Sequence, residues 1–173
     1  MIKIVKRIFL IFLAFIVIGF LIPNNIASPI APNEIDKIDP KSFWYYPWGE
    51  SRVHKGIDIF CKKGTDILSP VSGFIIETGY SSNGGNFIYL LGPKFRTYYF
   101  AHMDTTFVSQ YKYVSKGDII GKVGNTGNAD EKPHHLHYAI ETVFPYVWLY
   151  DNKAVDGWKK IFYLDPSKTL KTD

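Results

Sequence analysis

An unbroken apolar segment near the N-terminus is the strongest hydropathy feature of the chain. Lys3, Lys6 and Arg7 precede an uncharged run from Ile8 to Ile22, and Pro23 then ends it. A basic flank before an apolar run is typical of an export signal whose positive end stays in the cytoplasm. A membrane-spanning helix needs about 20 residues, so the run is short for one. It is nevertheless long for the apolar core of a cleavable signal.

The residues after this run offer only weak cleavage sites. Asn25-Ile26-Ala27 poorly matches the small-x-small pattern that signal peptidases read, and Ala31 is followed by Pro32. For residues 1–27 we therefore favour an uncleaved membrane anchor over a cleaved signal. Either interpretation places the rest of the chain in the cell envelope, held at the inner (cytoplasmic) membrane by an anchor or secreted after cleavage.

Short segments rich in Ile, Val, Tyr and Phe follow one another between turn residues from residue 51 to about 145, and no long amphipathic helix interrupts them. This pattern predicts an all-β domain over residues 51–145. Residues 28–50, which contain four prolines, are expected to form an extended linker, and residues 146–173 a C-terminal tail that packs back on the sheet. The predicted strands are Asp66–Val71, Phe74–Tyr80, Asn86–Leu91, Thr97–His102, Asp118–Val123 and His135–Thr142.

Composition narrows the function only slightly. Aromatic residues make up 17% of the 173 residues, which suits the packing of a β-rich core or a surface that grips an extended ligand. The net charge of +4 favours loose association with anionic polymers or membranes, but no basic run with interleaved aromatics indicates nucleic acid. Cys61 is the single cysteine, so an intrachain disulfide is excluded, and we expect it to be a small buried hydrophobe.

The five histidines carry the candidate chemistry. His54 lies four residues before Asp58, His102 lies between aromatic-rich segments, and His135 and His137 alternate along one predicted strand. Alternate strand residues face the same side, so His135 and His137 present adjacent imidazoles to one surface. Two histidines and one carboxylate form a typical catalytic zinc site. Spacing alone does not tell ligands from loop or core histidines, and His54, Asp58 and His102 each have an ordinary structural interpretation.

A wider pattern resembles the lysostaphin-like (LytM-type) zinc metallopeptidases, which cut peptides in peptidoglycan. The resemblance covers residues 50–142 and consists of several segments in order. These are Arg52–Asp58, Gly64–Gly73, Asn83–Asn86, Tyr98–Met103, Val114–Gly127 and His135–Tyr138.

The resemblance implies a fold, a cofactor and residue roles. The fold is a small open groove of antiparallel strands, and the cofactor is Zn2+. His54, Asp58 and His137 would ligate the metal, while His102 and His135 would assist catalysis. The implied activity is hydrolysis of peptide cross-links or stems of peptidoglycan by a metal-activated water. His134 has no counterpart in the pattern, and we expect it at the surface or donating to a neighbouring group.

Two other functions remain open at this stage. Some relatives of this kind have lost metal ligands and act as noncatalytic regulators that bind and activate cell-wall amidases. A wall-binding module that does not cut its ligand is a further alternative. The complete set of ligand-type residues favours an enzyme, but it does not identify the bond that is cut, which of His102 and His135 is the base, or the oligomeric state.

Overall fold

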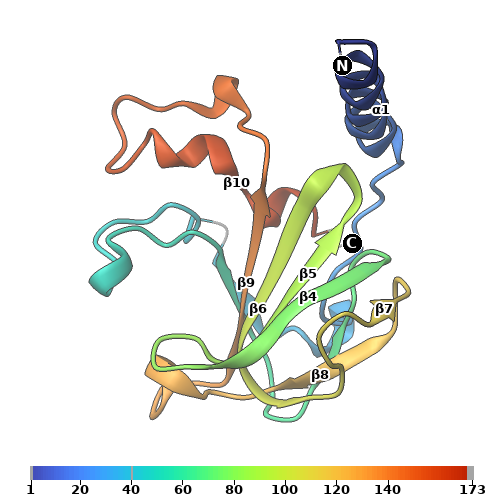
Figure 1. Cartoon of the computed structure of the whole chain (residues 1–173). Coiled ribbons are helices and arrows are strands. Elements are labelled where there is room, and N and C mark those ends of the chain that lie inside the picture. The colour runs from blue at the N-terminus through green and yellow to red at the C-terminus, as the bar shows by residue number, and fades with distance from the viewer. Residues whose placement is uncertain (1, 40, 171–173) are drawn as a thin grey trace.

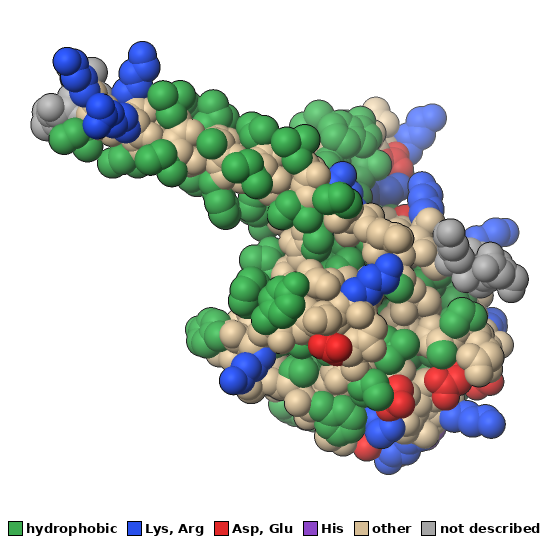
Figure 2. Space-filling model, turned by 90° about the vertical axis from the view of Figure 1, so that its right-hand side faces the viewer, with side chains coloured by type: hydrophobic (Ala, Val, Ile, Leu, Met, Phe, Trp, Pro, Cys, Tyr) green, Lys and Arg blue, Asp and Glu red, His purple; other side chains and the backbone are tan. Residues whose placement is uncertain are grey.

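An apolar helix is joined to a β-sheet domain in a computed structural model, which describes residues 2–39 and 41–170 (Figure 1). Met1, Pro40 of the predicted linker and residues 171–173 of the predicted tail lie outside the described residues. The helix α1 spans Ile2–Leu21, and most of its length projects away from the domain. Figure 2 shows it covered by hydrophobic side chains, with basic side chains at its far end.

Helix α1 is longer than the apolar run that the sequence shows. It begins at Ile2 and so includes the three basic residues, whose side chains have a high helix propensity. Its 20 residues correspond to a length of about 30 Å, which matches the hydrocarbon thickness of a bilayer. Lys3–Leu21 is long and apolar enough to cross a membrane, although a signal sequence has the same properties.

Ten β-strands form one sheet in the described part of the chain, and the paired strands are antiparallel. The main order is β1-β2-β9-β6-β5-β4-β7; β10 lies beside β9, and β8 pairs with both β3 and β6. The fold is therefore all-β, as the sequence predicts. The strands are β1 Lys37–Ile38, β2 Ile57–Phe60, β3 Asp66–Leu68, β4 Gly73–Ser81, β5 Gly85–Gly92, β6 Arg96–Thr106, β7 Tyr113–Val114, β8 Ile119–Val123, β9 His135–Thr142 and β10 Tyr163–Leu164.

Within residues 2–39 and 41–170, seven short 3-10 helices lie before, between and after these strands. They are η1 Pro32–Glu34, η2 Gly49–Ser51, η3 Pro93–Phe95, η4 Gly127–Ala129, η5 Val147–Leu149, η6 Lys159–Phe162 and η7 Pro166–Lys168. The longest of them, η6, has four residues, so the described residues of the domain contain no long helix.

Predicted and observed strands agree best where alternation is regular. β9 has the predicted bounds, and β4 and β5 differ from the prediction by one residue at each end. The strand predicted at Asp66–Val71 ends at Leu68, because Pro70 lacks the N–H that a ladder requires. β1, β2, β7 and β10 were not predicted; all four are short, and two of the four residues of β2, Ile57 and Asp58, belong to the His54–Asp58 motif.

The segment before the domain contributes to its core. Ile30 is fully buried and belongs to the main hydrophobic cluster, together with residues such as Ile57, Tyr98 and Tyr138. Trp44 is also buried, and its indole Nε1 donates a hydrogen bond of 2.9 Å to the carbonyl oxygen of Val155. Residues assigned to the linker and to the tail therefore contact each other and the sheet.

Replacing Ile30 with Ala should lower the free energy of unfolding by about 2–5 kcal/mol, because it removes buried methyl groups and leaves a cavity. Urea unfolding of the full chain in detergent would measure this. Ile119→Ala is the matched control: that side chain is 48% exposed, and its loss should change the same free energy by less than about 1 kcal/mol. Equal effects of the two substitutions would show that residues around Ile30 do not pack as described.

Candidate metal centre

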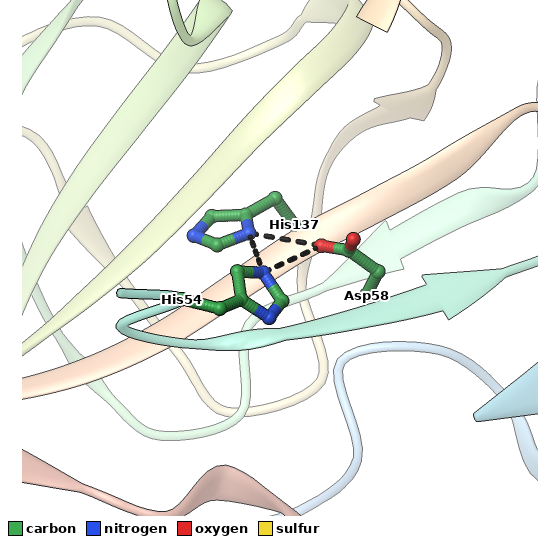
Figure 3. A group of neighbouring side chains, drawn as sticks. All are labelled: His54, Asp58 and His137. Carbon is green, nitrogen blue, oxygen red and sulfur yellow. Dashed lines mark hydrogen bonds and ion pairs between the residues drawn. The ribbon is translucent and has the colours of Figure 1, made fainter. Parts of the chain in front are cut away.

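The pairing of β2 with β9 brings together Asp58 and His137, two of the three candidate ligands. Asp58 on β2 lies directly opposite His137 on β9. Side chains of residues paired in this way lie on the same face of the sheet, about 4.5–5.5 Å apart at Cβ. His54 lies in the segment that leads into β2 and reaches the same point from the side (Figure 3).

Three side-chain atoms converge at this point. His137 Nδ1 is 2.9 Å from Asp58 Oδ1, His54 Nε2 is 3.1 Å from the same oxygen, and the two nitrogens are 3.0 Å apart (Figure 3). The structure thus brings together the three residues that the resemblance implies as ligands, and these atoms could hold a metal ion.

Gly56 allows this close approach. A Cβ at this position would lie 2.4 Å from the carbonyl oxygen of Tyr138, far inside van der Waals contact. Only glycine therefore lets the segment between His54 and Asp58 pass so close to the backbone of β9.

Hydrogen bonding shows why a cation suits this site. His54 Nδ1 is 3.0 Å from the carbonyl oxygen of Ser42, which can only accept, so a neutral His54 ring carries its proton on Nδ1. Its Nε2 then presents a lone pair toward the carboxylate oxygen of Asp58 and toward His137. At most one proton, on His137 Nδ1, is left to satisfy three lone-pair atoms. A metal ion would satisfy all three at once.

The ionisation states of the three groups agree with this role. Burial raises the pKa of Asp58, but the contacts of its carboxylate with His137 and His54 outweigh burial and hold the pKa well below its usual range. Burial lowers the pKa of His137, although the neighbouring carboxylate opposes the change. An ionised carboxylate and a neutral imidazole are the forms that ligate metals.

An irregular backbone brings His102 to the same cavity. Ala101 on β6 pairs with His137 and lines the cavity, so in a regular strand the next side chain would face the opposite side. His102 instead has a left-handed φ of +61°, and both residues line the cavity. A hydrogen bond of 2.7 Å from His102 N to the carbonyl oxygen of Gly84 holds this conformation, which is costly for a residue other than glycine.

Backbone carbonyls orient both additional histidines. His102 Nδ1 is 2.9 Å from the carbonyl oxygen of Thr126, and His135 Nδ1 is 2.7 Å from that of Pro133. Each neutral ring therefore keeps an unprotonated Nε2. The two rings lie side by side, with centroids 4.9 Å apart. Burial lowers the pKa of His102 to about 4, with partial compensation from the Thr126 carbonyl, so its ring is neutral at pH 7.

His134 takes no part in this arrangement. It precedes β9 and does not line the cavity, and its buried Nδ1 has no hydrogen-bond partner among the described residues.

The candidate site lies in a cavity of about 800 Å³ whose walls include residues that sequence reasoning did not single out. The Trp48 ring stacks on His54 with centroids 4.0 Å apart. Tyr89, Tyr99 and Glu141 form another part of the wall. Trp48 falls in the predicted linker, whose composition does not indicate a contact with the site. Glu141 could have been found from the sequence, because it lies four residues after His137 on β9 and so faces the same side.

Known proteins share this fold and sequence pattern. The chain is 31% identical over 100 residues to the L-Ala–D-Glu endopeptidase of Bacillus subtilis, covering 54% of this chain and 31% of that protein. It is 31% identical over 121 residues to the murein hydrolase activator NlpD of Escherichia coli, covering 64% and 32%. The chain spans about a fifth to two fifths of the length of the curated relatives it matches.

A solved structure and a family match extend the comparison. The catalytic domain of the antimicrobial peptidase lysostaphin from Staphylococcus simulans superposes with a TM-score of 0.61 at 27% identity, covering 79% of this chain and 91% of that domain. Residues 52–156, more than half of the chain, match Peptidase family M23. This chain therefore belongs to Peptidase family M23.

Proposed function

We propose that this protein is a zinc-dependent endopeptidase that hydrolyses peptide cross-links or stems of bacterial peptidoglycan. The convergence of His54, Asp58 and His137 on one point, beside two further histidines, is the observation that carries the proposal. The similarity to an L-Ala–D-Glu endopeptidase and to lysostaphin supports a peptide substrate of the cell wall.

The donor set suits zinc. Imidazole nitrogens and a carboxylate oxygen are zinc ligands, and three protein ligands leave a fourth position for the reaction. Ligand atoms around a tetrahedral zinc with bonds of about 2.0–2.2 Å lie roughly 3.3–3.5 Å apart, within a few tenths of an ångström of the separations here. When bound, zinc activates a water molecule for attack at neutral pH and polarises the substrate carbonyl.

His102 and His135 would move the protons of the reaction. Each presents an unprotonated Nε2 to the cavity because a backbone carbonyl holds the proton on Nδ1. Either nitrogen can accept a proton from the attacking water and later donate it to the leaving amine. The protonated ring can also stabilise the oxyanion that develops on the carbonyl oxygen.

A noncatalytic activator is the alternative function. The similarity to NlpD, a murein hydrolase activator, supports it. The presence of three ligand-type residues and two oriented histidines favours the enzyme, since an activator needs neither. Metal content and peptide release distinguish the two functions.

We further propose that α1 anchors the chain in the cytoplasmic membrane, with the domain outside the cytoplasm. Its length and the exposure of most of its apolar side chains support an anchor, and its basic N-terminal end supports this orientation. On blots of membrane fractions, the chain should keep its full precursor size, and deletion of residues 1–25 should release it. A mature form that lacks residues 1–27 would defeat the anchor and indicate a cleaved signal.

His137→Ala should abolish both zinc binding and hydrolysis, because it removes one of three ligands. Elemental mass spectrometry of the purified full chain should find one zinc per chain before the substitution and little after it. Mass spectrometry of muropeptides released from purified sacculi should find no products. Full cleavage of sacculi by the His137→Ala protein would contradict the proposed mechanism.

His102→Ala separates metal binding from catalysis. Its ring lies outside the ligand set, so the variant should keep one zinc per chain while hydrolysis falls by about 10²–10⁴-fold, as for loss of a general acid or base. His134→Ala is the control, and it should change neither zinc content nor hydrolysis. Unchanged hydrolysis in His102→Ala would remove this residue from the mechanism.

A further inference from the structure

Two oppositely charged side chains line the cavity on the side of His137 away from His135. His135, His137, Ala139 and Glu141 alternate along β9, and all four line the cavity. Glu141 lies four residues after His137, a distance of about 13 Å along the strand, so it lies well beyond the metal centre. The small side chain of Ala139 leaves space in the cavity between His137 and Glu141. Lys55 lines the cavity as well.

The carboxylate of Glu141 is enclosed by tyrosines. Tyr163 on β10 lies directly opposite it in register, and the rings of Tyr89 and Tyr99 stack on each other with centroids 4.4 Å apart. Burial raises the pKa of Tyr99 and of Tyr163 to about 12, and the nearby Glu141 charge adds to the effect. All these hydroxyl groups therefore remain protonated and can donate hydrogen bonds. Within the described residues, the Glu141 carboxylate makes no hydrogen bond or ion pair.

Lys55 supplies the opposite charge without closing an ion pair. Its ammonium lies 5.8 Å from the centroid of the Tyr163 ring, a cation–π contact. Its charge lowers the pKa of Glu141, but burial of that carboxylate has the larger effect and raises it. In the described part of the chain, no carboxylate oxygen lies within 4.0 Å of the Lys55 ammonium. A partly buried ammonium and a partly buried carboxylate thus share one end of the cavity without satisfying each other.

This combination selects among ligands. A singly charged group would be attracted by one of the two side chains and repelled by the other. A free α-amino-acid group carries an ammonium and a carboxylate on one carbon, and it can satisfy both at once. Within a peptide, both α groups remain free only on a residue that is joined to the rest of the peptide through its side chain.

We propose that this end of the cavity, formed by Lys55, Tyr89, Tyr99, Glu141 and Tyr163 and here called the Glu141 subsite, binds the free α-amino-acid group of a substrate residue linked through its side chain. The inference rests on the proposed function in taking a peptide as the ligand. The α-ammonium meets Glu141 and the α-carboxylate meets Lys55, with tyrosine hydroxyl groups beside them. The distance along β9 places this residue roughly three to four extended residues from the bond that is cut.

A set of three synthetic peptides tests the subsite. In the first, acetyl-Ala-Ala-Ala is joined to the side-chain amine of lysine, which leaves both α groups free. In the second the α-ammonium is acetylated, and in the third the α-carboxylate is an amide. Calorimetry on the zinc-loaded full-length His102→Ala protein avoids loss of peptide by hydrolysis. The first peptide should bind at least about tenfold more tightly than either analogue, the effect expected for one lost charge-assisted hydrogen bond.

Substitutions that remove one charge each test which side chain produces the preference for the peptide with both α groups free. Glu141→Gln should abolish the preference over the acetylated analogue, and Lys55→Met should abolish the preference over the amide. Glu50→Gln and Lys132→Met are matched controls, since both residues line the same cavity elsewhere and should leave both preferences intact.

Two results would overturn the subsite. One is that the protein with Glu141 and Lys55 unchanged binds all three peptides equally, or binds none of them. The other is survival of both preferences in Glu141→Gln and Lys55→Met. Because the readout is binding, the two proposals fail separately. If His102→Ala shows both preferences but the protein with His102 intact does not cleave sacculi, only the proposed hydrolysis is overturned. A peptidase that binds the three peptides equally would overturn only the subsite.

Discussion

The register between β2 and β9 is the constraint on which the rest of the site depends. It sets Asp58 opposite His137 with both side chains on the cavity face. Side chains alternate along a strand, so a shift of one residue would send one of them into the core. The core itself opposes such a shift, because Ile57, Ile59 and Leu136 are fully buried on the other face of the same two strands. Hydrophobic packing on one face thus fixes ligand geometry on the other.

The electrostatics of the centre follow from this geometry. Three lone-pair atoms lie within about hydrogen-bonding distance of one another in a buried position, where unpaired charge and unsatisfied polar atoms are costly. Backbone carbonyls fix the protons of His54, His102 and His135 on Nδ1. The chain therefore directs unprotonated nitrogens into one cavity, an arrangement that suits a bound cation and proton transfer beside it.

The sequence predicted the all-β fold and most strands because alternation and turn residues act locally. It also predicted that His135 and His137 share a face, since β9 is regular. Other features depend on contacts between distant segments. The left-handed conformation at His102 needs the Gly84 carbonyl, and the orientation of His54 needs the Ser42 carbonyl, in a segment that composition alone describes as a linker. The grouping of His54 and His102 with the β9 histidines came from family resemblance rather than from spacing.

Anomalous X-ray diffraction from zinc-loaded crystals of the full chain tests the central claim most directly. The account predicts one strong zinc peak, about 2.0–2.2 Å from His54 Nε2, Asp58 Oδ1 and His137 Nδ1. A zinc peak bound instead by other side chains, such as His134 or Cys61, or the absence of any peak between these three atoms, would contradict it.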